Sequence, residues 1–411
     1  MSIIGVDEVE ASNGRLVLRR GDRLTPLARD RAHELDIDVV DETATATTSS
    51  SARPAAREAQ LSNPGALPSP TLPALFRRGA PYPGLRGRTK TASASAPSSG
   101  RAQRVTIVGS GNVGTHTAMR LAETDLIDEI VLVDVVEGLA KGVALDLVHA
   151  SGLLGFATSI RGVSTVEEAG PSDYTIITAG RPRTPGMSRT DLTEANAAIV
   201  GPTAEAVGRV SPQGVIIVVT NPLDEMTQLA WRRSGLDAAR VVGMAGLLDS
   251  ARFQALAGTA ANARPDRVSA FALGAHGDEM LIPLSQARIG DIAASRVLGE
   301  NTASIVDRTR SSGAEVVGLL GKGSAFITPG LAAARMVEQM IRGASSVLSA
   351  TVRAQGEYGI HDTYIGLPVR LGRHGVTDIV ELPLTNDELH ELRSAASKIA
   401  ERVQLLSAEA G

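Results

Sequence analysis

A glycine-rich segment, Gly109-Ser-Gly-Asn-Val-Gly114, directly follows the apolar stretch 105–108 and precedes a helical stretch at 115–124. In a strand–turn–helix unit of this kind, the first glycine permits a tight turn and the second lets the main chain approach a pyrophosphate. The third glycine allows the helix to pack closely, and the N-terminus of the helix attracts negative charge. The segment therefore predicts a dinucleotide-binding turn with the contact residues Gly109, Gly111, Asn112, Val113 and Gly114.

Short apolar stretches alternate with helical ones along the chain after residue 103. Four of them are rich in β-branched residues and nearly all apolar: 105–108, 129–133, 174–177 and 215–220. Strands of this composition are buried on both faces, as in a parallel sheet covered by helices. The pattern predicts an α/β fold, with a doubly wound parallel sheet of Rossmann type at 103–250 and an α+β substrate or catalytic domain at 251–408.

Asp134 ends the second of these strands, 25 residues after Gly109. A carboxylate at this position bonds both hydroxyls of an adenosine ribose and repels a phosphate on the 2′ position. We therefore expect NAD as the cofactor rather than its phosphorylated form. The alternative is that Asp134 merely caps a turn.

The composition excludes several classes of site. The 411 residues include no cysteine, so disulfides and thiolate chemistry are ruled out. The seven histidines show no pair at metal-ligand spacing, and we expect no metal site. No apolar run reaches membrane-spanning length, and the first residues lack the pattern of a signal peptide. We expect an intracellular, cytoplasmic protein that does not bind membranes.

The first 102 residues differ in composition from the rest. Residues 43–102 are rich in Pro, Ser and Ala, and residues 43–100 carry 7 basic and 1 acidic side chain, which predicts a mostly disordered basic linker. Without interleaved aromatic residues, this basic stretch does not predict nucleic-acid binding. Residues 1–42 predict a small β-α-β-like module, with strands at 14–19 and 37–40 and a helix cap at Thr25. The string 24–30 resembles a terminal element of some bacterial microcompartment proteins, which suggests a packaging partner.

Arg183 and Arg189 lie six residues apart on a loop rich in Gly and Pro that follows an apolar strand. Arginine binds carboxylates bidentately and stays charged at any working pH. Two such groups on one loop fit a small dicarboxylate, whereas the alternative is a solvated basic loop.

From residue 103 to residue 408 the chain resembles the lactate and malate dehydrogenase family, and its lactate-dehydrogenase-like malate dehydrogenases in particular. Five segments match in the order that the family has: 109–114, 183–189, 219–222, 246–252 and 274–278. The resemblance implies an oxidoreductase that transfers hydride between NAD(H) and a 2-hydroxy acid. It also implies a homo-oligomer, either a dimer or a tetramer.

The resemblance assigns the catalytic group. His276 would donate a proton to the ketone oxygen, because an imidazole titrates near neutrality. Asp249 would orient its ring, and Asp249 and Arg252 share one face of a predicted helix because they lie three residues apart. Arg189 would stabilise negative charge on the ketone oxygen. An intrahelical ion pair is the alternative interpretation of Asp249 and Arg252.

The resemblance also assigns binding residues. Arg252 would bind the substrate carboxylate, Asn221 would bond the substrate oxygen, and Val219, Thr220 and Asn221 would lie beside the nicotinamide. Asn196 would contact the cofactor.

Arg183 decides the substrate, since lactate dehydrogenases usually have glutamine there and malate dehydrogenases have arginine. The sequence therefore predicts malate and oxaloacetate. A lactate or broad 2-hydroxyacid dehydrogenase and an inactive NAD-binding scaffold remain as alternatives. The chain departs from the family at Arg181, where an apolar residue is common, and in its N-terminal extension.

Overall fold

The computed structural model describes residues 102–182, 187–277, 279–321, 323–343 and 345–409, together with parts of the N-terminal segment. Those parts are 3–4, 8–9, 11–12, 14–18, 22–25, 28, 31–32, 34–35 and 37–41. The chain divides into two units, Met1–Thr71 and Leu72–Gly411, and each is considered by itself. The predicted linker lies outside the described residues, except that Ala102 is buried in the first strand of the second unit.

The N-terminal unit contains two small parallel sheets. In one, β1 (Ile3–Ile4) pairs with β3 (Arg23–Leu24), and in the other β2 (Arg15–Leu18) pairs with β4 (Asp38–Asp41). The side chains of Val9, Ala28 and Ala32 form a small core. The Thr25 hydroxyl accepts a hydrogen bond from the Ala28 N–H at 3.1 Å, as its predicted role as a helix cap requires. Pro26 lies outside the described residues.

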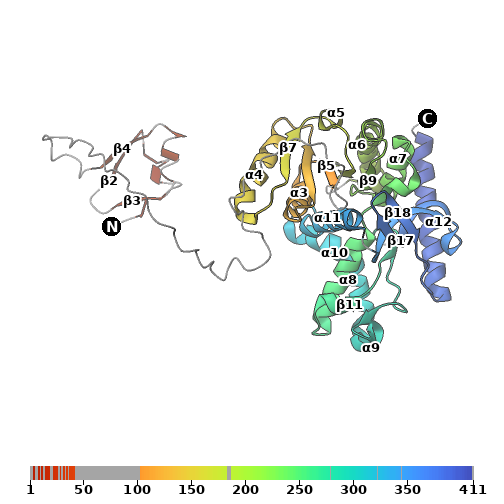
Figure 1. The fold of residues 1–411 in the computed structure, drawn as a ribbon. Coiled ribbons are helices and arrows are strands. Elements are labelled where there is room, and N and C mark those ends of the chain that lie inside the picture. The colour runs from red at the N-terminus through yellow and green to blue at the C-terminus, as the bar shows by residue number, and fades with distance from the viewer. Residues whose placement is uncertain are drawn as a thin grey trace, which may run out of the picture. The chain divides into compact units, whose positions relative to one another are not determined.

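The second unit is built on one large sheet (Figure 1). Six of its strands are parallel and lie in the order β7-β6-β5-β8-β9-β10, the doubly wound order in which a nucleotide site forms where the strand order reverses. The predicted parallel sheet is confirmed. These strands are β5 (Ala102–Val108), β6 (Ile127–Val133), β7 (Ser159–Val163), β8 (Tyr174–Ile177), β9 (Val215–Val218) and β10 (Val241–Gly243).

Alternate side chains of these strands enter two different cores, which explains why their sequences are apolar throughout. Val105 and Ile107 join one core, with α3 and α4. Val108 and Val218 join the other, with α5, α6 and α7. These helices are α3 (Asn112–Glu123), α4 (Leu139–Leu154), α5 (Val166–Ala169), α6 (Arg189–Val210) and α7 (Leu223–Ser234).

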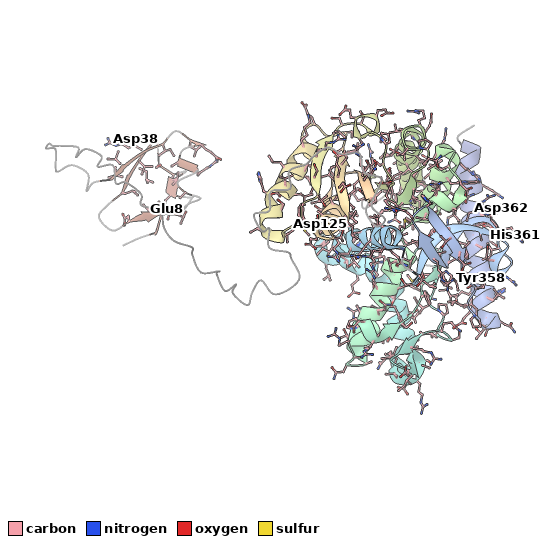
Figure 2. The ribbon with its side chains drawn as sticks, in the orientation of Figure 1. Glu8, Asp38, Asp125, Tyr358, His361 and Asp362 are labelled. Atoms are coloured by element: carbon pink, nitrogen blue, oxygen red, sulfur yellow. The ribbon has the colours of Figure 1, made fainter. Side chains whose placement is uncertain are left out.

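The turn that follows α3 depends on Asp125. Asp125 adopts a positive φ of 52°, and its carboxylate accepts a hydrogen bond from the Ala157 N–H at 3.1 Å (Figure 2). Asp tolerates this left-handed conformation better than most residues. The contact holds the entry to β6 beside the entry to β7.

The same sheet continues into the C-terminal half through antiparallel strands. Gly243 of β10 pairs with Thr351 of β16 (Val347–Gln355), which pairs in turn with β17 (His361–Gly372). The other strands here are β12 (Leu273–Gly274), β13 (Met280–Leu281) and β18 (Gly375–Ile379), and β11 (Val268–Ser269), β14 (Arg288–Ile289) and β15 (Ile292–Ala293) form a separate sheet.

Five helices accompany these strands. α12 packs against β17 and α7 (Figure 1), and α8 carries the predicted Asp249 and Arg252. The predicted boundary at residue 250 falls inside α8. The five helices are α8 (Gly246–Ala260), α9 (Ala294–Leu298), α10 (Thr302–Leu320), α11 (Ile327–Arg342) and α12 (Asn386–Glu409).

Candidate active site

The glycine turn between β5 and α3 leaves the main chain open where a pyrophosphate would approach. A Cβ atom on Gly109, whose φ is +102°, would lie 2.6 Å from the Ala179 nitrogen, and one on Gly114 would lie 1.9 Å from the Gly109 oxygen. A Cβ atom on Gly111 would meet nothing within 4 Å. Asn112 and Val113 open α3, whose N-terminus has no side-chain cap. The turn therefore fits a dinucleotide.

Asp134 lies at the carboxyl end of β6, beside this turn. Its carboxylate accepts hydrogen bonds from the Ser110 N–H at 2.8 Å and from the Val136 N–H at 3.0 Å. The next two side chains, Val135 and Val136, are 92% and 58% exposed. Two neighbouring apolar side chains in water, beside the carboxylate that the sequence predicts to bind a ribose, could offer a surface to an aromatic base. Sequence reasoning missed them, although two valines directly after a strand end were a visible signal.

The ends of β8 and β9 are tied together next to the glycine turn. The Val219 N–H bonds the Ile177 carbonyl at 2.9 Å, and the Thr220 hydroxyl donates to the Ala179 carbonyl at 2.7 Å. Asn221 follows with a cis peptide bond to Pro222. All three predicted residues of this strand end therefore lie at the carboxyl edge of the sheet, where a nucleotide site forms at the reversal of the strand order.

The Asn196 side chain is only 1% exposed and bonds main-chain groups on both sides. Its amide oxygen accepts from the Arg181 N–H at 2.7 Å, and its amide nitrogen donates to the Asn221 carbonyl at 2.6 Å. It thus holds the start of the arginine loop against the end of β9. The predicted cofactor contact of Asn196 stays a prediction. The side chain of Arg181 is exposed at this point.

A buried acid holds the predicted catalytic histidine. Asp249 is 2% exposed at its side chain, and its carboxylate lies 2.8 Å from His276 Nδ1 and 3.1 Å from a terminal nitrogen of Arg252. The His276 and Arg252 side chains are 20% and 14% exposed, so both reach the surface of the site. The structure brings together the three residues that the sequence predicted to act together, although 27 positions separate Asp249 from His276.

Two opposing effects act on His276. Burial lowers the pKa of its imidazole, but the charge and the hydrogen bond of Asp249 outweigh burial and raise the pKa above the usual 6.5. The bond to Nδ1 also leaves Nε2 as the nitrogen that can face a substrate. The arrangement can therefore deliver a proton near neutral pH.

Two predicted arginines lie partly or wholly outside the described residues. Arg183 lies in the segment 183–186, which is outside the described residues. The side chain of Arg189 is outside them as well. Arg189 begins α6, whose N-terminus carries a capping box made by Ser188 and Asp191. Asp278, in the matched segment 274–278, is also outside the described residues.

Comparison with known sequences places both halves of the second unit in one family. Residues 103–243 match the lactate/malate dehydrogenase NAD binding domain, and residues 247–410 match the lactate/malate dehydrogenase alpha/beta C-terminal domain. The chain belongs to the lactate/malate dehydrogenase family. The predicted family is confirmed, and NAD is confirmed as the cofactor of this family member.

Relatives and solved structures agree with this assignment. This chain is 44% identical over 306 residues to a malate dehydrogenase of Thermomicrobium roseum, and the matched region covers 74% of this chain and 98% of the relative. It is 36% identical to the structure of malate dehydrogenase from Salinibacter ruber, with a TM-score of 0.71 over 75% of this chain and 100% of that chain. A lactate dehydrogenase structure from Cryptosporidium parvum, complexed with lactic acid and nicotinamide adenine dinucleotide, is 32% identical, with a TM-score of 0.71 over 75% of this chain and 98% of that chain.

Among the residues that the structure describes, no helix combines the length and the apolar character needed to cross a membrane.

Proposed function

We infer that the chain is an NAD-dependent malate dehydrogenase, which interconverts malate and oxaloacetate. The observation that carries this inference is the buried Asp249–His276 pair beside Arg252, in a chain about 40% identical to malate dehydrogenases over 94% or more of their length. A proton donor at the ketone oxygen and a cation at the carboxylate are what this reaction requires of the protein.

His276 donates the proton to the ketone oxygen in the direction of malate formation and removes it in the reverse direction. Asp249 fixes the ring orientation through Nδ1 and stabilises the imidazolium. Because Asp249 is 2% exposed, water screens this interaction little. The nicotinamide supplies or accepts the hydride when it is bound.

Arg252 uses one terminal nitrogen for Asp249, which leaves its other nitrogens to bind the substrate carboxylate bidentately. In this proposal Arg189 stabilises charge on the ketone oxygen, Asn221 bonds that oxygen, and Arg183 neutralises the second carboxylate. The proposal for Arg183 rests on the resemblance and on its place in the sequence between Arg181, which Asn196 holds, and Ser188, the cap of α6. Gly186 would let this loop close over the substrate.

The cofactor contacts that we propose comprise the glycine turn, the ribose-binding acid and the ends of β8 and β9. They are Gly109, Gly111, Asn112, Val113, Gly114, Asp134, Asn196, Val219, Thr220 and Asn221. The open main chain at Gly111 and the exposed Val135 and Val136 support this placement.

The test compares initial rates of NADH oxidation with oxaloacetate and with pyruvate, for the native chain and for Arg183→Gln. A strong preference for oxaloacetate that the variant loses supports both the activity and the role of Arg183. A preference for pyruvate in the native chain would favour the lactate or broad 2-hydroxyacid dehydrogenase. NADH binding without reduction of either substrate would favour the inactive scaffold.

We propose that the protein is a homo-oligomer in which a second copy covers α4. This helix is apolar on its outer side as well, with Leu145, Val148 and Leu153 exposed by 57%, 41% and 90%. A helix that is apolar on both sides is usually covered on both. Sedimentation should give a dimer or larger assembly, and Leu145→Glu should weaken it, whereas a monomeric native chain would contradict the proposal.

We propose that the N-terminal module is a packaging element, as its resemblance to a microcompartment segment suggests. The family matches begin at residue 103, so the module is an addition to the family's usual length. Residues 1–102 fused to a fluorescent protein should form puncta in a host that makes such compartments. Diffuse fluorescence there would reject the idea.

A further inference from the structure

A second buried acid lies behind the catalytic histidine. Asp224, near the start of α7, is 2% exposed, and its carboxylate accepts the main-chain N–H of His276 at 3.0 Å. Its other oxygen accepts the hydroxyl of Thr351, on β16, at 2.8 Å. Asp224 therefore connects α7, β16 and the loop that carries His276.

The titratable groups that face Asp224 come from its own helix and from two other places. Glu225 follows it on α7, His276 lies on the loop, and Arg402 lies on α12. Arg402 forms ion pairs with Glu225 and with Glu279, at 3.3 Å for the latter. Arg402 is bonded to these two acids. Among the described residues, the hydrogen bonds of the Asp224 carboxylate go to His276 and Thr351.

His276 in turn faces charged groups from two helices. Asp249 and Arg252 lie on α8, and Asp224 lies on α7. The charges of Asp249 and Asp224 raise the pKa of the imidazole, whereas Arg252 lowers it. Asp249 is bonded to Arg252 as well, so one of the two supporting acids is already partly neutralised.

We propose that Asp224 is a positioning residue for the dehydrogenase reaction, which holds the main chain of His276 and supports the protonated state of its ring. This proposal rests on the proposed function, because it assigns a role in the same proton transfer. Asp224 acts through His276 and does not touch the substrate.

The state of Asp224 itself depends on pH. Burial, followed by the charge of Glu225, raises the pKa of Asp224 to about 7. Because Asp224 and His276 face each other, the ionisation of each affects the other. The support that Asp224 gives to the imidazolium is present when its carboxylate is ionised, and it disappears as the pH falls below neutrality.

Asp224→Asn removes the charge and keeps the hydrogen bonds. The amide oxygen still accepts the His276 N–H, and the amide nitrogen donates to the Thr351 hydroxyl, which can accept as well as donate. We expect the pKa of the His276 ring to fall, and kcat/KM for oxaloacetate at a pH above that pKa to fall with it, by roughly tenfold for each unit of pKa. The ring is titrated by NMR in histidine-labelled protein without substrate, with His276→Asn for assignment, and kcat/KM is measured over the same pH range.

Glu225→Gln is the matched control. It removes a buried acid of the same charge at the next position of α7, one that bonds Arg402 and not His276. Because the loss of the Glu225 charge lowers the pKa of Asp224 and keeps its carboxylate ionised, we expect the pKa of His276 not to fall in this variant. An equal change in both variants, or an unchanged pKa in a folded Asp224→Asn variant, would overturn the proposal.

Thr351→Val provides a second variant in case Asp224→Asn does not fold. It leaves the carboxylate but removes one of its hydrogen-bond donors, so the pKa of Asp224 rises further. Less of Asp224 is then ionised near neutral pH, and the pKa of His276 falls as a result. An unchanged His276 pKa in this variant would also count against the proposal. Failure of the native chain to reduce oxaloacetate concerns the proposed function alone, because the NMR titration does not depend on activity.

Discussion

At the scale of single residues, we expect the His276 imidazole to determine how the reaction responds to pH. In the proposed mechanism, reduction of oxaloacetate needs the imidazolium, whose pKa Asp249 raises against the opposing effect of burial. We expect kcat/KM for reduction to be highest below this pKa and to fall as the pH rises through it. For malate oxidation, which needs the neutral ring, we expect the opposite slope. Initial rates in both directions over one pH series test this, and parallel slopes would exclude His276 as the proton carrier.

Asp224 makes the native state less stable as the pH rises. Its pKa is about 7 in the folded chain and near 3.8 in the unfolded chain, so the unfolded state gives up its proton first. Stability is therefore unaffected below about pH 4, decreases between pH 4 and 7, and stays lower above that range, by about 4 kcal/mol at most.

Asp224→Asn removes this pH-dependent cost. We expect the variant to have a higher Tm than the native chain at pH 8 and an equal Tm at the acid end of the range. Thermal unfolding of both proteins across the pH series is the measurement. A lower Tm for the variant at pH 8 would mean that the carboxylate stabilises the fold.

At the scale of elements, one carboxylate joins three strands of the parallel sheet. Glu129 on β6 bonds Arg104 on β5 and Arg161 on β7, the latter at 2.8 Å. Burial alone would raise the pKa of Glu129, but the hydrogen bonds of Arg161 and Arg104 outweigh it and hold the pKa below 4.5. The stabilisation is present above about pH 4.5 and is lost as the pH falls through the lowered pKa.

Glu129→Gln should lower the free energy of unfolding by about 1 kcal/mol at pH 7. The difference from the native chain should vanish in acid. Glu167→Gln is the control, because Glu167 and its partner Arg209 are 55% and 60% exposed and such pairs contribute little. Urea unfolding at pH 7 and at a pH well below 4 measures both, and equal losses in the two variants at pH 7 would contradict the three-strand role.

The elements differ in how far the sequence predicts them. Local residues alone predict the turn at 109–114 and the position of Asp134, because a glycine motif between an apolar strand and a helix is typical of a dinucleotide-binding turn. The strands β8 and β9 follow from their continuous apolar character. The contact between Asp249 and His276 came from the family resemblance, because nothing local joins positions 27 residues apart.

The rest of the site depends on tertiary packing. Asp224 meets Thr351 across 127 positions and Glu225 meets Arg402 across 177, so no spacing in the sequence signals these contacts. The bonds of Asn196 to the main chain at Arg181 and Asn221 are also tertiary, because they tie α6 to the start of the arginine loop and to the end of β9, across 15 and 25 positions. The cofactor contact of Asn196 stays a prediction.

At the scale of the whole molecule, the N-terminal unit has a small core of its own, formed by Val9, Ala28 and Ala32. The family matches begin at residue 103, after this unit. Removal of residues 1–100 should therefore leave kcat, KM and Tm unchanged. Kinetics and thermal unfolding of the shortened chain test this, and a folded but inactive product would assign the N-terminal unit a part in the site.

The pairing of Gly243 with Thr351 joins the two family domains at the level of the main chain. If either domain were separated from the other, β10 or β16 would become a bare strand edge, with unpaired N–H and C=O groups open to other chains. We therefore expect residues 103–243 and 247–410 to behave as two halves of a single folding unit and to unfold in one cooperative transition.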